Sequence, residues 1–297
     1  MKKLALLLAA LGAFVMIAPV INAQGTVTRV EKPDPYNSAY TWAMSQDRNV
    51  VYSVGGINVL VTRDSSRTWQ VHSQIPNTDY DLLIGIKADS NVIMVGATPI
   101  YSNQNGRIFR SSNTGATWQS VINPVSTPQY GFSAFEFLGT RMIAVGATPT
   151  ETSQSIMIES PDRGATWTVT SALSNFQGGF GKIVKASDSE AFLLGSEGKI
   201  AYTSDGGYTW IDRRVPDPST YVYDMEILPS QVGTTAKVQV SSPNLNRTKI
   251  YETIDGGEHW AQTMATSDTN FLVGTGIWTT SIGTHVSGGG NYLVGDV

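Results

Sequence analysis

The chain has 297 residues, no cysteine, and 20 lysines and arginines against 24 aspartates and glutamates, which gives a net charge of −4. The lack of cysteine excludes disulfides, thiolate metal sites and a cysteine nucleophile. The acidic balance argues against nucleic-acid binding, which usually needs a basic face. We therefore expect a protein held by its core, with no metal, no cofactor and no nucleic-acid partner.

The N-terminal segment has the order of features found in secretory signal peptides. Lys2 and Lys3 precede an apolar run over residues 4–20, and Ala23 is a small residue before Gln24. We expect cleavage after Ala23, leaving residues 24–297 as one monomeric domain exported to the periplasm or the cell exterior, without membrane insertion. The alternative is a retained membrane anchor, because 17 apolar residues is the lower limit for a bilayer span of roughly 17 to 25.

Five copies of one short pattern, Ser/Thr-x-Asp-x-Gly-x-Thr-Trp, divide the rest of the chain. Their tryptophans are 49, 49, 43 and 50 residues apart, and a period of roughly 40 to 50 residues is typical of four-stranded propeller blades. The acid or amide and the tryptophan of each copy are Asp64 and Trp69, Asn113 and Trp118, Asp162 and Trp167, Asp205 and Trp210, and Asp255 and Trp260.

Each repeat divides into four strand-like runs. In the third repeat these are residues 131–138, 141–146, 155–159 and 166–170, with period-two patterning typical of strands. The five repeats end near residues 73, 123, 172, 215 and 266. A glycine closes the second run in four repeats, where we expect close approach between neighbouring sheets; these are Gly55, Gly96, Gly146 and Gly195.

The repeated acid has a structural explanation as a turn-closing group between the third and fourth strands. A short carboxylate or amide there can accept backbone N–H groups, and we expect positive φ at Gly115, Gly164, Gly207 and Gly257. Ser66 replaces that glycine in the first copy, which predicts the most strained turn. Each tryptophan is expected to pack between blades. The alternative, calcium ligands or catalytic acids, is disfavoured because five copies around a ring cannot converge on one point.

The pattern resembles the Asp-box, or bacterial neuraminidase repeat, propellers. Residues 40–265 resemble most closely the photosystem II stability/assembly factor-like propellers, and more distantly the sialidase-like proteins; residues 190–210 carry the likeness best. The resemblance implies an all-β propeller of four-stranded antiparallel blades with Asp-box turns between the third and fourth strands. It also implies an assembly role through a basic patch that binds a partner protein, for which Arg213 and Arg214 are the candidates here.

The number of blades follows from the repeat length. Residues 24–297 hold about 5.7 repeats, so six blades are favoured, with residues 269–297 forming a last blade closed by residues 26–31. The alternative is a seven-bladed longer parent, because residues 291–296 look like a second strand rather than a third.

Function is expected in the loops on the side of each blade opposite the Asp-box turns, since loops on a rigid scaffold carry most binding chemistry. We expect no catalytic residue and a protein- or glycan-binding scaffold. The candidate binding residues are Tyr80, Tyr101, Tyr130, Arg213, Arg214, Asp217, Tyr221 and Arg247. The alternative is that these residues belong to ordinary solvated loops without a binding role.

The alternative function is a glycoside hydrolase. A sialidase-like site would need an arginine cluster and a tyrosine–glutamate pair, for which Tyr223 and Glu226 are available on an unsuitable strand position. A glucan-cleaving site would need two acids, drawn from Asp79, Asp81, Asp217 and Asp224.

Overall fold

The structure is a computed structural model, and the statements below concern the residues that it describes. These are residues 20–21, 27–28, 44–47, 50–55, 57–64, 68–76, 81–99, 105–121, 124–125, 131–147, 154–176, 178–217, 221–228, 233–242, 247–265, 274–280, 283–288 and 291–295.

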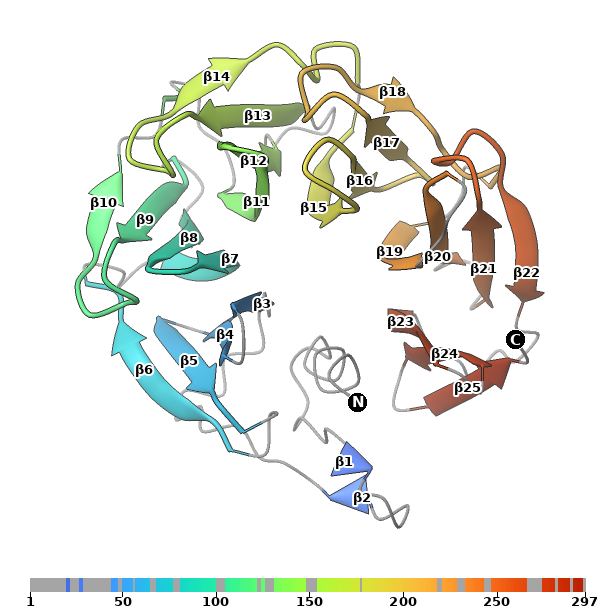
Figure 1. Ribbon diagram of the computed structural model, residues 1–297, viewed down its shortest axis with the longest axis horizontal. Coiled ribbons are helices and arrows are strands. Elements are labelled where there is room, and N and C mark those ends of the chain that lie inside the picture. Colours follow the sequence, from blue (N-terminus) through green and yellow to red (C-terminus); the bar gives the residue numbers. More distant parts are fainter. Residues whose placement is uncertain are drawn as a thin grey trace. The chain divides into compact units, whose positions relative to one another are not determined.

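The described part of the chain is all β, and its strands form successive antiparallel sheets, each built from strands that follow one another in the sequence (Figure 1). Five sheets have four strands, and we number them 1 to 5. Sheet 1 is β3 (Met44–Asp47), β4 (Val50–Gly55), β5 (Asn58–Thr62) and β6 (Gln70–Gln74). Sheet 2 is β7 (Asp81–Asp89), β8 (Val92–Pro99), β9 (Arg107–Ser111) and β10 (Gln119–Val121).

The next three sheets repeat the same order. Sheet 3 is β11 (Phe132–Leu138), β12 (Arg141–Ala147), β13 (Ser155–Ser160) and β14 (Thr168–Thr170). Sheet 4 is β15 (Phe180–Lys185), β16 (Ala191–Gly195), β17 (Ile200–Thr203) and β18 (Ile211–Asp212). Sheet 5 is β19 (Tyr221–Leu228), β20 (Thr235–Ser242), β21 (Arg247–Thr253) and β22 (Ala261–Ala265).

The prediction of four-stranded antiparallel sheets is confirmed, and each Asp-box joins the third strand of its sheet to the fourth. The second strands are the most completely buried; all five residues of β16 are buried, for example. The fourth strands are short and exposed, since all of β18 is exposed. This gradient is what a sheet shows when its inner strands lie between neighbouring sheets and its last strand forms an edge.

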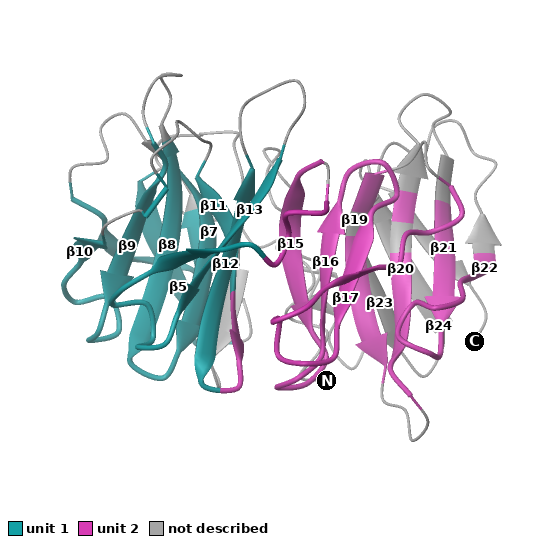
Figure 2. Ribbon diagram, turned by 90° about the horizontal axis from the view of Figure 1, so that it is seen from above, with its two compact units in different colours: residues 1–135, 140–171 teal, residues 136–139, 172–297 magenta. Residues whose placement is uncertain are grey.

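The chain divides into two compact units, which are described separately (Figure 2). Unit 1 comprises residues 1–135 and 140–171, and unit 2 comprises residues 136–139 and 172–297. In unit 1, a buried core joins sheets 1 and 2 through Tyr52, Val54, Leu83 and Ile93, among others. In unit 2, the corresponding core joins sheets 4 and 5 and includes Phe192, Leu194, Val238 and Tyr251.

The glycines that end the second strands mark tight backbone contacts of two kinds. A Cβ added at Gly96 would lie 1.8 Å from the carbonyl oxygen of Phe132, which begins sheet 3, so this glycine does allow the approach of the next sheet. At Gly195 a Cβ would lie 2.7 Å from the oxygen of Gly179, at the entry to its own sheet, and at Gly146 the nearest atoms are also at the entry to its own sheet. The glycine position therefore serves close packing within a sheet as well as between sheets.

The two ends of the chain carry smaller sheets. β1 (Val20–Ile21) pairs with β2 (Val27–Thr28), and β23 (Gly274–Thr280), β24 (Gly283–Gly288) and β25 (Asn291–Gly295) form a three-stranded sheet. Asn291–Gly295, which the seven-blade alternative takes as a second strand, is thus the third strand of its sheet. The blade count, the closing role of residues 26–31 and the signal peptide stay predictions, because much of residues 1–43 lies outside the described part of the chain. Among the described residues, no helix is long and apolar enough to span a membrane.

Candidate functional site

The Asp-box turns are closed by the side chain that the repeat conserves within this chain. In sheet 3, Asp162 accepts hydrogen bonds at Oδ1 from the backbone N–H of Thr166 (2.8 Å) and from the hydroxyl of Ser160 (2.8 Å), and at Oδ2 from the hydroxyl of Thr166 (2.7 Å). Burial raises the pKa of Asp162, but these hydrogen bonds outweigh it and hold the pKa at about 2. Both oxygens are therefore engaged inside the turn.

The uncharged copy has the same geometry. Asn113 accepts at Oδ1 from the backbone N–H of Thr117 (2.9 Å) and from the hydroxyl of Ser111 (2.9 Å), and donates from Nδ2 to the hydroxyl of Thr117 (2.8 Å). Since an amide can take the place of the carboxylate, charge is not what the turn requires.

In the four box turns of sheets 2 to 5, the backbone passes through the left-handed region twice in succession. The box glycines have positive φ as predicted: 89° at Gly115, 81° at Gly164, 83° at Gly207 and 85° at Gly257. The residue before each glycine is also left-handed, including two that are not glycine, Thr114 at 55° and Arg163 at 56°. The strained turn predicted at Ser66 lies outside the described residues.

The box tryptophans make two kinds of contact. Trp118 donates its indole N–H to the hydroxyl of Ser73 in sheet 1 (3.0 Å), and Trp260 donates to the carbonyl of Arg213, which follows sheet 4 (2.6 Å). Trp167 and Trp210 donate instead to the glycine carbonyl of their own turn, at 3.1 Å each. The first pair ties neighbouring sheets together, whereas the second pair locks the turn.

Among the residues that the structure describes, no three histidine, aspartate or glutamate side chains gather in a way that could hold a metal ion. The carboxylate oxygens of the described box acids accept hydrogen bonds within their own turns, so these acids have a structural role. A candidate site must be sought elsewhere.

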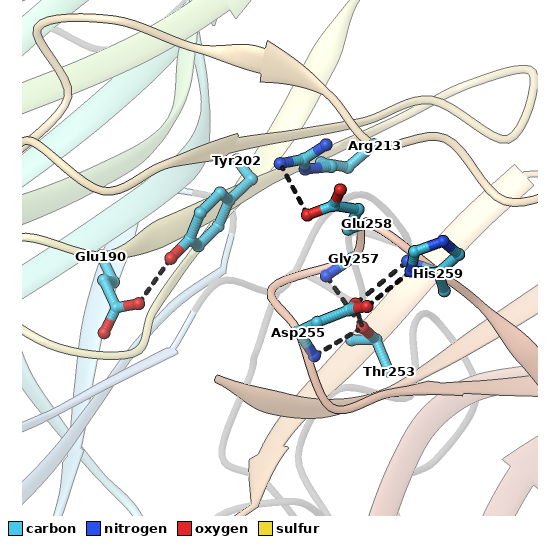
Figure 3. A network of polar contacts seen from close by, with 8 residues as sticks. All are labelled: Glu190, Tyr202, Arg213, Thr253, Asp255, Gly257, Glu258 and His259. Atoms are coloured by element: carbon cyan, nitrogen blue, oxygen red, sulfur yellow. Dashed lines mark hydrogen bonds and ion pairs between the residues drawn. The ribbon is translucent and has the colours of Figure 1, made fainter. Parts of the chain in front are cut away.

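Arg213, a predicted binding residue, contacts the Asp-box of the next sheet (Figure 3). Its guanidinium lies 3.9 Å from the carboxylate of Glu258, its carbonyl accepts the N–H of Trp260, and its side chain is 22% exposed. We expected this arginine among the loops opposite the box turns. Instead, it forms part of the contact between sheets 4 and 5.

A tyrosine–carboxylate pair is present near the same turn (Figure 3), but its electrostatics oppose catalysis. The hydroxyls of Tyr202 and Thr234 both donate to Oε1 of Glu190, each at 2.5 Å. Burial and the hydrogen bond to Glu190 raise the pKa of Tyr202 above 10, whereas a nucleophilic phenol has to be easier to deprotonate. Hydrogen bonds from Thr234 and Tyr202 lower the pKa of Glu190. The pair is a structural link.

Two of the acids proposed for a glucan-cleaving site, Asp217 and Asp224, are ion-paired, whereas Asp79 and the side chain of Asp81 lie outside what is described. Lys249 donates to Asp217 (2.6 Å), and the hydrogen bond from Lys249 to Asp217 raises the pKa of that lysine. Lys182 donates to the buried Asp224, at the edge where β15 and β19 each carry a bulge. An acid held by a lysine in this way is poorly placed to protonate a leaving group.

An open groove of about 630 Å³ lies along the edge strand of sheet 4, on residues of unit 2. The segment before β15 contributes Asn175 and Phe176, the turn between β16 and β17 contributes Glu197 and Lys199, and the edge strand with its flanks contributes Trp210, Ile211, Asp212 and Arg214. Both contributing connections leave the ends of the strands opposite the Asp-box turn. The groove therefore lies on the loop side where function was predicted, and it includes Arg214.

Two ion pairs dominate the walls of the groove. Arg214 donates to Asp212 from Nη2 to Oδ2 (2.5 Å) and from Nε to both oxygens (3.0 and 3.3 Å). The hydrogen bonds to Asp212 raise the pKa of Arg214. Burial raises the pKa of Asp212, but the hydrogen bonds from Arg214 outweigh this effect and lower it. Lys199 donates to Glu197 (2.6 Å) and lowers the pKa of Glu197. The four charges cancel in pairs.

The remaining predicted binding residues have different outcomes. Tyr221 begins β19 and is 47% exposed. Arg247 begins β21, but its side chain lies outside what is described, as do Tyr80, Tyr101 and Tyr130 entirely. The prediction missed Phe176 and every other groove residue except Arg214, although the turn at residues 196–199 belongs to the class of loops in which function was expected.

No protein-family model matches the sequence, and no curated protein is significantly similar to it. Solved structures do share its fold. YCF48 bound to D1 peptide has a TM-score of 0.58 and 17% identity, covering 84% of this chain and 76% of that one. The GH74 xyloglucanase from Xanthomonas campestris has a TM-score of 0.60 and 16% identity, covering 84% and 44%. The Trypanosoma rangeli sialidase in complex with sialic acid has a TM-score of 0.51 and 10% identity, covering 92% and 55%.

These proteins match the kinds of propeller that the sequence resemblance indicated. The chain spans less than half of the xyloglucanase and just over half of the sialidase. At identities of 10 to 17% the likeness concerns the fold, and fold does not carry function. The chain has a β-propeller fold of four-stranded antiparallel blades.

Proposed function

We propose that the chain is an exported, non-catalytic propeller that binds a protein or glycan partner through the side of its blades opposite the Asp-box turns. The observation that carries the proposal is the groove at the edge of sheet 4, which combines an open cavity, a half-buried aromatic ring at Phe176 and fixed polar groups at Asp212 and Arg214. A concave, partly apolar surface with a few oriented polar groups is the usual form of a binding site.

The state of the described acids supports binding rather than catalysis. Asp217 and Asp224 are each held by a lysine, and Tyr202 has its pKa raised rather than lowered. A glycosidase needs two carboxyl groups in different protonation states facing one substrate bond. The likeness to YCF48 bound to D1 peptide supports a binding role as well, since that propeller holds a peptide partner.

The second candidate is a glycoside hydrolase. What favours it is the fold likeness to a xyloglucanase and a sialidase. The two functions differ in one measurable respect, which is whether the bound partner is cut.

The test uses purified protein lacking residues 1–23, assayed for binding and for hydrolysis on the same ligands. We expect saturable binding to at least one defined glycan or peptide in an array, and no release of reducing sugar from sialylated or glucan substrates. Sugar release that is lost in both Asp217→Asn and Asp224→Asn, while Asp205→Asn retains it, would overturn the proposal. Asp205 is a suitable control because its carboxylate closes a box turn, where an amide also functions.

Export is tested independently. Expression of the whole chain in a bacterial host, followed by cell fractionation and N-terminal sequencing, should recover the protein outside the cytoplasm with Gln24 as its first residue. A cytoplasmic product beginning at Met1 would contradict this part of the proposal.

A further inference from the structure

We infer that the groove at the edge of sheet 4 is a binding site for an uncharged polysaccharide. The inference rests on the proposed binding function and adds the place and the chemical class of the ligand. The residues that line the groove are Asn175, Phe176, Glu197, Lys199, Trp210, Ile211, Asp212 and Arg214.

The charge of the groove selects against ionic ligands. Lys199 is paired with Glu197, and Arg214 is paired with Asp212 through three contacts of 2.5 to 3.3 Å. A phosphate or a carboxylate would meet cationic groups whose charge Asp212 and Glu197 already balance. Because the pairs are already made, the net charge that the groove presents is zero, which matches a ligand without charge.

The polar groups are nevertheless rich in hydrogen-bonding capacity. The Asp212–Arg214 pair holds a planar guanidinium and a carboxylate side by side, so hydrogen-bond donors and acceptors both line the groove. Asn175 adds a side-chain amide, which both donates and accepts. Hydroxyl groups of a sugar also donate and accept, so they can bind such a set without breaking either ion pair.

The apolar lining suits the carbon face of a sugar ring. Ile211 is 48% exposed although it belongs to a strand, and Phe176 is half buried with its ring held edge-on against Phe180 at a centroid distance of 5.6 Å. A ring fixed in this way can pack against a ligand at little cost in side-chain entropy. The cavity of about 630 Å³ lies within the roughly 300 to 1,000 Å³ of small-ligand sites.

A peptide fits this groove less well. Peptides that bind at a sheet edge gain affinity from a ladder of main-chain hydrogen bonds. The edge strand β18 has only two residues, Ile211 and Asp212, so the ladder would be short. The backbone N–H of Arg214 is also already bonded to Asp212 (3.1 Å).

The test is affinity electrophoresis of the chain lacking residues 1–23 in native gels, followed by calorimetric titration. The gels contain neutral β-glucan, neutral galactomannan or anionic polygalacturonate. We expect retardation by at least one neutral polysaccharide and none by polygalacturonate. The dissociation constant should rise at least tenfold in Phe176→Ala and in Arg214→Lys, because the lysine keeps the charge but loses the planar fork.

Two further variants separate binding from folding. Ile211→Ser changes an exposed side chain, so it should weaken binding while leaving the thermal transition unchanged. Tyr208→Ala, whose ring is 67% exposed and not part of the groove lining, should bind as the parent does.

Each other outcome overturns the inference in a distinguishable way. If no neutral polysaccharide binds but a defined protein or peptide does, the inference fails and the proposed function stands. If polygalacturonate or a peptide binds and Phe176→Ala abolishes it, the groove takes another class of ligand. If a polysaccharide is cut, the proposed function fails as well.

Discussion

The substitution Gly96→Ala tests whether this glycine sets the spacing between sheets 2 and 3. Gly96 does not adopt a left-handed φ, so alanine is compatible with its backbone conformation and the effect should be steric alone. The added Cβ would lie 1.8 Å from the carbonyl oxygen of Phe132 and 2.9 Å from its carbonyl carbon. Real Cβ contacts essentially never fall below 3.0 Å, so the two strands would have to separate by at least 1.2 Å.

The magnitude follows from what must move. The obstructing atoms are backbone, and the neighbouring Phe132 is fully buried, so no flexible side chain can absorb the overlap. Overpacking of a well-packed core costs typically about 1 to 3 kcal/mol, and this case belongs at the upper end. Alanine also reduces the conformational entropy of the unfolded chain, which stabilises the folded state by about 0.4 to 1 kcal/mol. We expect a net destabilisation of about 2 kcal/mol or more, which lowers the melting temperature by about 4 °C or more.

The assay is urea and thermal unfolding followed by circular dichroism and tryptophan fluorescence, with Gly146→Ala as the matched control. There the nearest atoms to the added Cβ lie at 3.1 and 3.2 Å, so small adjustments suffice and the change should stay below about 1 kcal/mol. If Gly96→Ala unfolds at the same denaturant concentration as the control, the close approach does not determine the spacing and the reasoning is refuted.

Three further predictions concern the box turns and their tryptophans. Asp162→Ala should lower stability by about 1 to 2 kcal/mol in urea unfolding, because it removes the acceptor of three hydrogen bonds, whereas Asp162→Asn should cost less than half as much. The hydrogen bond to Asp255 and its charge raise the pKa of His259 above 6.5, so an NMR titration should show this raised value and Asp255→Asn should return it to about 6.5. The stability that this pair contributes is complete below pH 6.5 and is lost as the pH rises through the raised pKa; a His259 pKa below 6.5 would contradict the geometry. Trp118→Phe should cost about 1 kcal/mol through loss of the N–H donated to Ser73, and Ser73→Ala should add little to it, whereas additive losses would exclude the bond.

The sheets and their turns could be predicted from the sequence because their determinants are local. Residues 155–159 were expected as a strand, and β13 is Ser155–Ser160. Alternating side chains and the box pattern are enough to place such a strand and the turn after it. The left-handed glycines follow from the same turn chemistry, but the left-handed Thr114 and Arg163 do not, since neither residue type indicates such a conformation.

The candidate site was less predictable because it depends on contacts between distant segments. Phe176, Glu197 and Asp212 belong to three separate segments, and only the folded sheet brings them to one groove. Arg213 was misplaced for a related reason. The edge strand β18 ends at Asp212, so no alternating pattern extends to Arg213 to show which side its side chain faces. The Arg213 guanidinium instead lies beside the Glu258 carboxylate in the box of the next sheet.

The backbone hydrogen bonds of the box turns have a consequence for how such a chain can evolve. The turn before the fourth strand bonds back to the turn before the second strand of the same sheet: Thr114 N–H to the carbonyl of Asn91 (2.9 Å), Gly206 N–H to that of Ser189 (2.8 Å) and Gly256 N–H to that of Thr234 (3.0 Å). Both partners of each of these bonds lie within one repeat, so a gene segment that encodes one repeat encodes the whole link. Gain or loss of a whole repeat therefore leaves this link intact in every remaining sheet.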